Sequence, residues 1–78
     1  MLTGLQIRLA RTALRWTVDK LADLSGVSWA KLQKTEKKDS QPNLDESLLL
    51  KIRELFESNG IEFIEENDNY HASIKIKK

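Results

Sequence analysis

The sequence predicts a mainly α fold, in which a four-helix domain is followed by a C-terminal β-hairpin. Apolar residues recur at intervals of three and four up to Gly60, which is the spacing of a helix face. After Gly60 they alternate with polar residues, which is the spacing of a strand. A chain of 78 residues has room for one core, so we expect a helical domain over residues 1–60 and a hairpin tail over residues 61–78.

The first predicted helix covers about residues 4–15. Ile7, Ala10 and Leu14 fall on one face of it. Thr3 and Gln6 fit a capping box, in which the threonine oxygen accepts an amide proton and the glutamine side chain reaches back. We therefore expect the helix to begin just after Thr3 and to bury one side.

A second helix is predicted over residues 18–25, where Thr17 can serve as the N-cap. Its inward residues would be Leu21, Ala22 and Leu24. Gly26 follows at the place where helices commonly end in a left-handed residue, a conformation that glycine adopts without steric cost. The chain should therefore turn sharply after this helix.

Two further helices are predicted over about residues 28–37 and 44–59, separated by a polar loop that contains the only proline. Ser28 can cap the third helix, and Leu32 is its clearest inward residue. Asn43 followed by Glu46 offers an N-cap pattern for the fourth helix. The apolar stripe of the fourth helix consists of Leu48, Leu49, Ile52, Leu55 and Phe56.

The tail is predicted to form two strands, over residues 61–65 and 70–77, with a cluster of turn-forming residues at 66–69 between them. A two-stranded hairpin is marginally stable by itself. We therefore expect it to pack on a helix or on another chain.

Composition excludes several kinds of site. The chain has no cysteine and a single histidine, His71, so a thiol nucleophile and a structural zinc site are not expected. No carboxylate is paired with a nucleophile or a phosphate loop, so we expect neither an enzyme nor a cofactor. The longest apolar run, residues 48–50, is far below the roughly 18 residues of a membrane span. The N-terminal residues have no secretory pattern, so a cytoplasmic protein is expected.

Charge is unevenly divided along the chain. Residues 1–38 hold eight basic and three acidic side chains, a net charge of +5. Residues 39–78 hold five basic and nine acidic side chains, a net charge of −4. This division favours an anionic partner on one face of the molecule.

Residues 17–36 have the spacing of a helix-turn-helix. Ala22 supplies a small residue where two helices would cross, and Gly26 supplies the turn. Val27 and Leu32 fit as apolar plugs between the helices. In such a motif the second helix is presented to the major groove of DNA, although the same spacing can arise in any compact helical corner.

Residues spread over nearly the whole chain match the pattern of one known family. They are Thr3, Gly4, Gln6, Ile7, Arg8, Arg11, Leu14, Trp16, Leu21, Ala22, residues 25–28, Glu36, Gly60, Glu62, Phe63 and Ile64. With them the chain resembles the phage-repressor-like (XRE) helix-turn-helix regulators of bacteria, in their small form with a C-terminal hairpin. The resemblance implies a repressor-like fold and a bacterial or phage transcriptional regulator, typically a repressor, that binds double-stranded DNA at the nucleoid.

The resemblance also implies roles for individual residues. Base edges would be met by three residues of the recognition helix, Trp29, Ala30 and Lys34. Phosphates would be contacted by Thr17, Ser28, Lys31 and Lys38. Arg11 and Glu36 match a structural ion pair that ties the first helix to the end of the third. No metal ligand or catalytic residue is implied.

The chain departs from the family pattern at three positions. Val18 stands where a glutamine usually anchors a phosphate, and Trp29 stands where a polar or basic residue is common. Thr35 replaces a large aliphatic residue, which should thin the core there. Because an exposed tryptophan suits a protein contact better than base readout, the alternative function is a protein-interaction or antitoxin-like module with a polypeptide partner.

The tail is the predicted dimerisation element. Its apolar residues are Phe63, Ile64, Ile74 and Ile76. One small helical core cannot cover all of them, because they lie on both faces of the hairpin. A strand edge can also pair with another strand. We expect a homodimer through residues 61–77, by edge pairing or face packing, with recognition helices about 34 Å apart. The alternative is a monomer whose hairpin caps the fourth helix.

Overall fold

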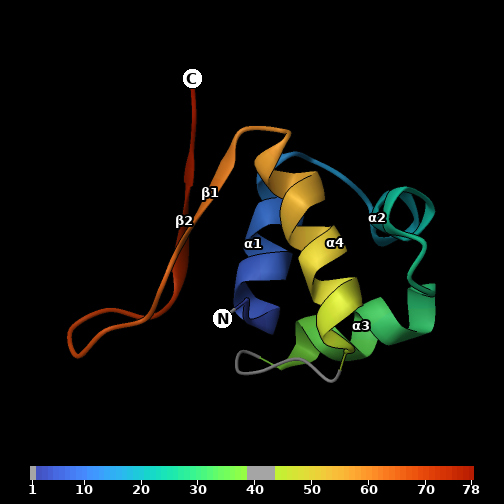
Figure 1. Cartoon of the computed structure of the whole chain (residues 1–78), viewed down its shortest axis with the longest axis horizontal. Coiled ribbons are helices and arrows are strands. Elements are labelled where there is room, and N and C mark those ends of the chain that lie inside the picture. The colour runs from blue at the N-terminus through green and yellow to red at the C-terminus, as the bar shows by residue number, and fades with distance from the viewer. Residues whose placement is uncertain (1, 39–43) are drawn as a thin grey trace.

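The computed structural model describes residues 2–38 and 44–78. This part of the chain forms four helices and one antiparallel two-stranded sheet (Figure 1). The elements are α1 (Gly4–Ala13), α2 (Val18–Ser25), α3 (Trp29–Lys37), α4 (Glu46–Glu57), β1 (Ile61–Ile64) and β2 (Ser73–Ile76). The predicted mainly α fold with a C-terminal hairpin is therefore confirmed. None of these helices has the length and apolar character needed to cross a membrane.

Helix α1 begins with the predicted capping box. The Gln6 amide donates to Thr3 Oγ1 at 3.1 Å, and the Thr3 amide donates to Gln6 Oε1 at 3.0 Å. The helix ends at Ala13, two residues earlier than predicted. It ends there because Arg15 adopts a left-handed conformation, with φ of 60°, and the Trp16 amide closes the turn onto the Arg11 carbonyl at 3.0 Å.

Helices α2 and α3 are joined by a turn of three residues, and both have the predicted caps. Thr17 Oγ1 accepts the Lys20 amide at 3.0 Å, and Ser28 Oγ accepts the Lys31 amide at 3.3 Å. Gly26 is left-handed, with φ of 75°, as expected for the residue that ends α2. The third helix starts at Trp29, because Ser28 is its cap.

The inward position predicted for Leu24 is wrong, because this side chain is exposed. A helix of eight residues buries only a narrow stripe, and in α2 that stripe consists of Leu21 and Ser25. The Ser25 hydroxyl is satisfied in the interior, since its oxygen accepts the Val27 amide at 3.2 Å. The buried position of Ser25 was not predicted.

Helix α4 is shorter at both ends than the predicted residues 44–59. Its N-cap is Asp45, whose side chain makes no capping hydrogen bond, and the predicted cap Asn43 lies outside the described residues. At the other end the chain tightens, because the Asn59 amide donates to Phe56 O at 2.9 Å. Gly60, with φ of 88°, then directs the chain into β1.

The strands pair antiparallel, with Ile61 opposite Ile76 and Phe63 opposite Ile74. Both strands are shorter than predicted, and residues 65–72 connect them. The connection is longer than the predicted residues 66–69 because Asn67 forms a separate turn. In this turn Asn67 Oδ1 accepts the amides of Asn69 and Tyr70 at 2.8 and 2.9 Å. The alternating tail therefore contains one short pairing rather than two long strands.

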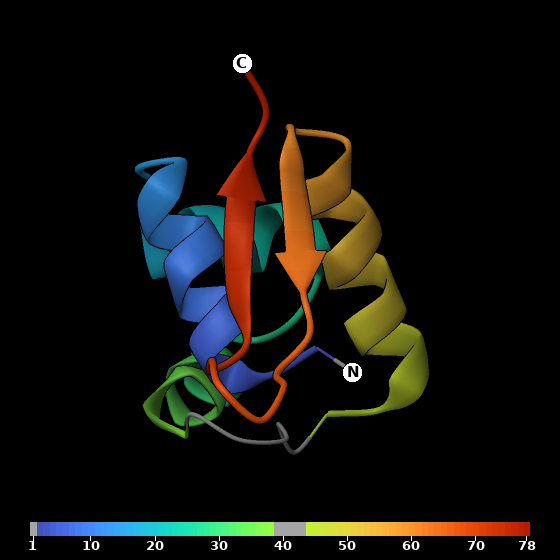
Figure 2. The ribbon, with the colours of Figure 1, turned by 90° about the vertical axis from the view of Figure 1, so that its left-hand side faces the viewer.

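The core lies between the helices and the inner face of the sheet. Figure 2 shows β2 crossing α1 while β1 runs beside α4. The fully buried side chains include Ile7, Leu21, Leu32, Ile52, Phe56 and Ile61. Trp16 stacks on Phe56 with ring centroids 5.5 Å apart, and Phe63 meets Phe56 edge-on at 6.2 Å. The hairpin thus covers both α1 and α4, which leaves the outer side of α3 in solvent.

Candidate nucleic-acid interface

Helix α3 presents a basic face to solvent. Its inward side consists of three buried residues, Leu32, Thr35 and Glu36. Its exposed residues, together with the C-cap, are Trp29, Ala30, Lys31, Lys34, Lys37 and Lys38. We call these six residues the α3 face. Trp29, a large apolar side chain, is 49% exposed.

No exposed carboxylate on α3 offsets the four lysines. Glu36 is the only acidic residue of the helix, and it is 6% exposed. Its charge is compensated on the inner side by Arg11. The α3 face therefore carries four positive charges without an acidic residue of its own helix between them.

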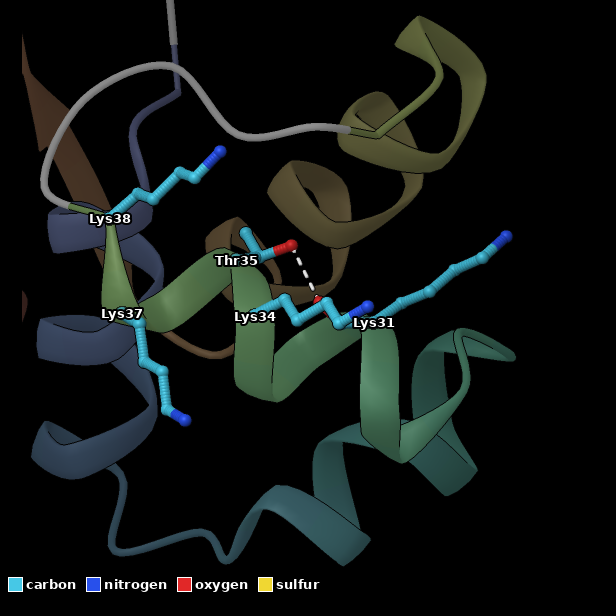
Figure 3. Close-up of a pocket in the computed structure, with 5 residues that line it drawn as sticks. All are labelled: Lys31, Lys34, Thr35, Lys37 and Lys38. Carbon is cyan, nitrogen blue, oxygen red and sulfur yellow. Dashed lines mark hydrogen bonds between the residues drawn. The ribbon is translucent and has the colours of Figure 1, made fainter.

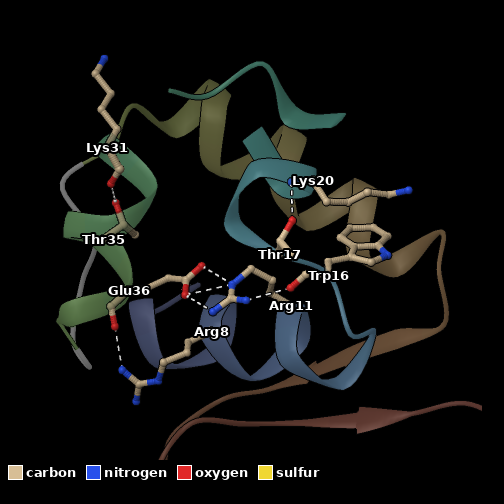
Figure 4. A network of polar contacts seen from close by, with 8 residues as sticks. All are labelled: Arg8, Arg11, Trp16, Thr17, Lys20, Lys31, Thr35 and Glu36. Carbon is tan, nitrogen blue, oxygen red and sulfur yellow. Dashed lines mark hydrogen bonds and ion pairs between the residues drawn. The ribbon is translucent and has the colours of Figure 1, made fainter. Parts of the chain in front are cut away.

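The ion pair between Arg11 and Glu36 holds α3 against α1 (Figure 4). Arg11 Nε lies 2.8 Å from Glu36 Oε2, and Nη2 lies 2.8 Å from Oε1. The same guanidinium donates to the Trp16 carbonyl at 2.8 Å. Arg8 adds a second link, because its Nη1 donates to the Glu36 carbonyl at 2.7 Å. The end of α3 is thus fixed by two arginines of α1.

Gly4 marks the closest approach of α1 to α3. A Cβ atom at this position would collide with the carbonyl oxygens of Thr35 and Lys38. A residue without a side chain is therefore required where the start of α1 meets the end of α3. The sequence showed Gly4 only as part of the family pattern, since the spacing of apolar residues contains no sign of this contact.

The lysines of α3 surround a hollow on the surface (Figure 3). It is lined by Lys31, Lys34, Thr35, Lys37 and Lys38. The Thr35 hydroxyl donates to the Lys31 carbonyl at 2.7 Å, so this polar group is satisfied within its own helix. Thr35 is accommodated in the interior for the same reason. In Figure 3 the lysine side chains leave the helix in different directions, so their ammonium groups do not converge on one point of the hollow.

The exposed residues of α3 lie on three different sides of the helix. At 3.6 residues per turn, Ala30, Lys34 and Lys37 point furthest from the buried side. Lys31 and Lys38, seven residues apart, lie along one flank, and Trp29 lies on the opposite flank. The five predicted contact residues of α3 and its C-cap are thus all exposed, but Trp29 is separated from Lys31 and Lys38 by the width of the helix, and Lys37 joins Ala30 and Lys34 at the centre.

Two predicted phosphate contacts lie at helix starts instead. Thr17 and Ser28 are exposed N-caps, and each hydroxyl oxygen already accepts a backbone amide. A hydroxyl that accepts one hydrogen bond can still donate its proton to another acceptor, such as a phosphate oxygen. Both caps therefore keep a donor for a ligand.

A second hollow joins α1, the start of α2 and α3. It is lined by Arg8, Arg11, Val18, Gln33, Glu36 and Lys37. Sequence reasoning did not assign Arg8, Gln33 or Lys37 to the site. Their spacing contained a signal, because Arg8 precedes Arg11 by three residues and Lys37 follows Lys34 by three, which places each pair on one helix face.

The four predicted dimerisation residues differ in accessibility. Phe63 is 9% exposed and packs on Phe56 of its own chain, whereas Ile64 and Ile74 are half-buried. Ile76 is 59% exposed. The inner face of the hairpin is therefore occupied by its own helices, and what remains accessible is the end of β2.

Among residues 2–38 and 44–78, no group of three or more histidine, aspartate or glutamate side chains is arranged to hold a metal ion. Comparison of the chain with family models, curated proteins and solved structures gave no significant match.

Proposed function

We propose that this chain is a non-enzymatic regulator that binds double-stranded DNA with a sequence preference, and that it acts in the cytoplasm at the nucleoid. In this proposal α2 and α3 form a helix-turn-helix, and α3 enters the major groove. The observation that carries it is the α3 face, whose four exposed lysines have no exposed acidic residue between them. The resemblance to the XRE regulators, in which repression is the usual role, supports the same proposal.

The centre of the α3 face would read bases. Lys34 has the length and the donors to reach guanine O6 and N7 in the major groove. Ala30 is small enough to let the helix approach the bases closely, and its methyl group can meet a thymine methyl. Trp29, on the flank, would add apolar contact beside them.

The edges of the site would hold the DNA backbone. Lys31 and Lys38 lie along one flank of α3, where an ammonium group can meet a phosphate. The Thr17 and Ser28 hydroxyls would donate to phosphates at the starts of α2 and α3. Because Arg11, Arg8 and Gly4 fix the end of α3 against α1, the helix would enter the groove in one orientation.

The test is selection of bound fragments from random duplexes, followed by fluorescence anisotropy across a range of salt concentrations. The two lysine–phosphate contacts of each chain, at Lys31 and Lys38, predict a plot of log K against log salt with a slope of about −2 for each chain bound. Absence of salt-sensitive binding to any duplex at micromolar protein would end the proposal.

A matched pair of variants locates the interface. Changing Lys31, Lys34 and Lys38 to alanine should abolish binding, because it removes three charges from the α3 face. Changing Lys75, Lys77 and Lys78 to alanine removes the same charge from the tail and should leave the contacts of each α3 with DNA intact. Equal losses of affinity in both triple variants at half-site DNA would mean that binding depends on net charge alone.

Trp29 favours a second candidate function, a protein-interaction or antitoxin-like module on the same fold. A half-exposed tryptophan can anchor a protein partner at the edge of the α3 face. Pull-down after nuclease treatment distinguishes the two functions. A stoichiometric partner that is retained by the native chain and lost in Trp29→Ala supports this second function, whereas DNA selection without any such partner supports the first.

A further inference from the structure

The two edges of the hairpin differ in their access to solvent. The Lys77 amide donates to the Gly60 carbonyl at 2.7 Å, so residues 60 and 77 form a hydrogen-bonded pair of the ladder. In an antiparallel ladder such pairs alternate with pairs whose amides and carbonyls point away from the partner strand. The residues whose amide and carbonyl groups point away from the partner strand are therefore Ile61 and Phe63 on β1, and Ile74 and Ile76 on β2.

Only β2 offers these backbone groups to another strand. Ile61 is 1% exposed and Phe63 is 9% exposed, so the outer edge of β1 is covered by its own chain. Ile76 is 59% exposed and Ile74 is half-buried, and no partner within residues 2–38 and 44–78 is hydrogen-bonded to the outward groups of these two residues. Figure 2 shows the two strands side by side, with β2 on the side of α1 and β1 on the side of α4. An open edge of this kind pairs readily with another strand.

Apolar surface lies beside this edge. Leu9 is one of the exposed large apolar residues, and it follows Gln6 by three positions on α1. Gln6 Nε2 donates to the Ser73 carbonyl at 3.1 Å, so this face of α1 looks toward β2. Ile76 thus gives the β2 edge an exposed apolar side chain that a second strand would cover, and Leu9 adds exposed apolar surface on α1.

The hairpin carries opposite charges at the two ends of its β2 side, while Glu62 of β1 lies opposite Lys75 on the other strand. Its C-terminal end carries Lys75, Lys77 and Lys78, all exposed. The connecting segment at the other end carries Glu66 and Asp68, also exposed. When two such hairpins pair antiparallel through β2, the basic end of each lies toward the acidic end of the other. This charge complementarity points to a second copy of the chain as the occupant.

We propose that β2 is the interface of a homodimer, in which two copies pair edge to edge into a four-stranded sheet of order β1-β2-β2-β1. The pairing is isologous, about a two-fold axis near Ile74. Centring the axis on Ile74 places Lys75 opposite Ser73 of the other copy. Axes at Lys75 or Ile76 would place Lys75 opposite Lys75 or Lys77, and like charges directly opposite are destabilising. The proposal does not depend on DNA binding and is tested without DNA.

Sedimentation equilibrium of the full chain gives the first test, with a dimer expected at tens of micromolar. Two charge-reversal variants then probe the arrangement. Lys77→Glu with Lys78→Glu makes both ends acidic, and Glu66→Lys with Asp68→Lys makes both ends basic. Each variant alone should dimerise about tenfold or more weakly, because like ends meet. An equimolar mixture should recover a dimer that contains one copy of each, because opposite ends meet again.

The backbone contact has its own pair of variants. Ile76→Pro removes an outward amide that the ladder with β1 does not use, so it should abolish the dimer and leave the monomer folded. Ile76→Ala keeps the amide and should retain the dimer more strongly than Ile76→Pro. Circular dichroism of every variant verifies folding, and Lys20→Glu with Lys51→Glu is the control for two charge changes outside the hairpin.

A monomeric full-length chain at these concentrations overturns the proposal, as does a dimer that neither the charge reversals nor Ile76→Pro weaken. A mixture of the two reversed variants that remains monomeric overturns the antiparallel arrangement. Saturation of β2 by an acidic extended peptide at concentrations where two copies do not pair would assign the edge to a different polypeptide.

Discussion

Arg11 and Glu36 join α1 to the end of α3 through two parallel hydrogen bonds, with Nε to Oε2 and Nη2 to Oε1 both 2.8 Å. Because the same guanidinium donates to Trp16 O, one side chain links α1, the segment that leads into α2, and α3. Both partners are largely shielded from solvent. The pair therefore fixes the orientation of the α3 face and contributes to the stability of the fold.

Replacing Glu36 with glutamine should destabilise the chain by about 3 kcal/mol, because Arg11 would be left without its counter-charge in a shielded site. Urea unfolding measures this change. Glu57→Gln is the matched control, since Glu57 pairs with Arg53 at 3.3 Å on the exposed surface of α4. That change should cost less than about 0.5 kcal/mol. Equal effects at the two positions would show that the Arg11 pair is not specially stabilising.

Gly4→Ala should destabilise the chain by about 1–3 kcal/mol, although alanine is the better helix former. The added methyl group would collide with the Thr35 and Lys38 carbonyls and push α1 away from α3. Thermal unfolding measures the loss. Thr12→Ala, at an exposed position of the same helix, is the control and should remain within about 0.5 kcal/mol of the native chain. A stabilised Gly4→Ala chain would contradict the close approach.

The elements could be predicted from sequence because their signals are local. Thr3, Thr17 and Ser28 each accept an amide three residues ahead, and Gly26 adopts the positive φ expected of it. Boundaries were less accurate. The left-handed Arg15 shortens α1 without a signal in its residue type, since arginine is an ordinary helix former.

The candidate site was predictable where it follows helix periodicity. The lysine spacing on α3 is visible in the sequence, and the family resemblance supplied the pairing of Arg11 with Glu36. The close contact of Gly4 with the end of α3 and the burial of the β1 edge both depend on segments that are distant in sequence. No local pattern carries that information, because it arises only when the helices and the hairpin pack together.

Gln6 is a further residue with a role that only the fold reveals. Its Oε1 accepts the Thr3 amide, while its Nε2 donates to the carbonyls of Ile64 and Ser73 at 2.9 and 3.1 Å. Gln6→Glu keeps the cap but turns an oxygen toward two carbonyls, so it should cost about 2–3 kcal/mol and loosen the hairpin.

Thr3→Ala is the control for Gln6→Glu, because it removes the hydrogen bonds of the capping hydroxyl, leaves Gln6 Nε2 on its two carbonyls, and should cost about 1 kcal/mol. Urea unfolding gives both free energies, and amide hydrogen exchange at β1 and β2 follows the hairpin separately. Faster exchange of the strand amides should appear in Gln6→Glu and not in Thr3→Ala. Unchanged exchange in both variants would mean that Gln6 does not hold the hairpin.

Lys34 and Lys38 should contribute to DNA binding in different ways, because one lies at the centre of the α3 face and the other on its flank. Lys34→Ala should relax the preference at one base pair and cost about 1–3 kcal/mol of binding free energy at the selected site. Lys38→Ala should weaken binding to all duplexes alike and make the salt slope shallower by about 1. Anisotropy on the selected duplex and on random duplexes, each over a salt series, separates the two effects. Loss of affinity from Lys34→Ala that is the same on selected and random duplexes would assign Lys34 to the phosphates, in common with Lys31 and Lys38, and would leave base readout to Ala30 and Trp29.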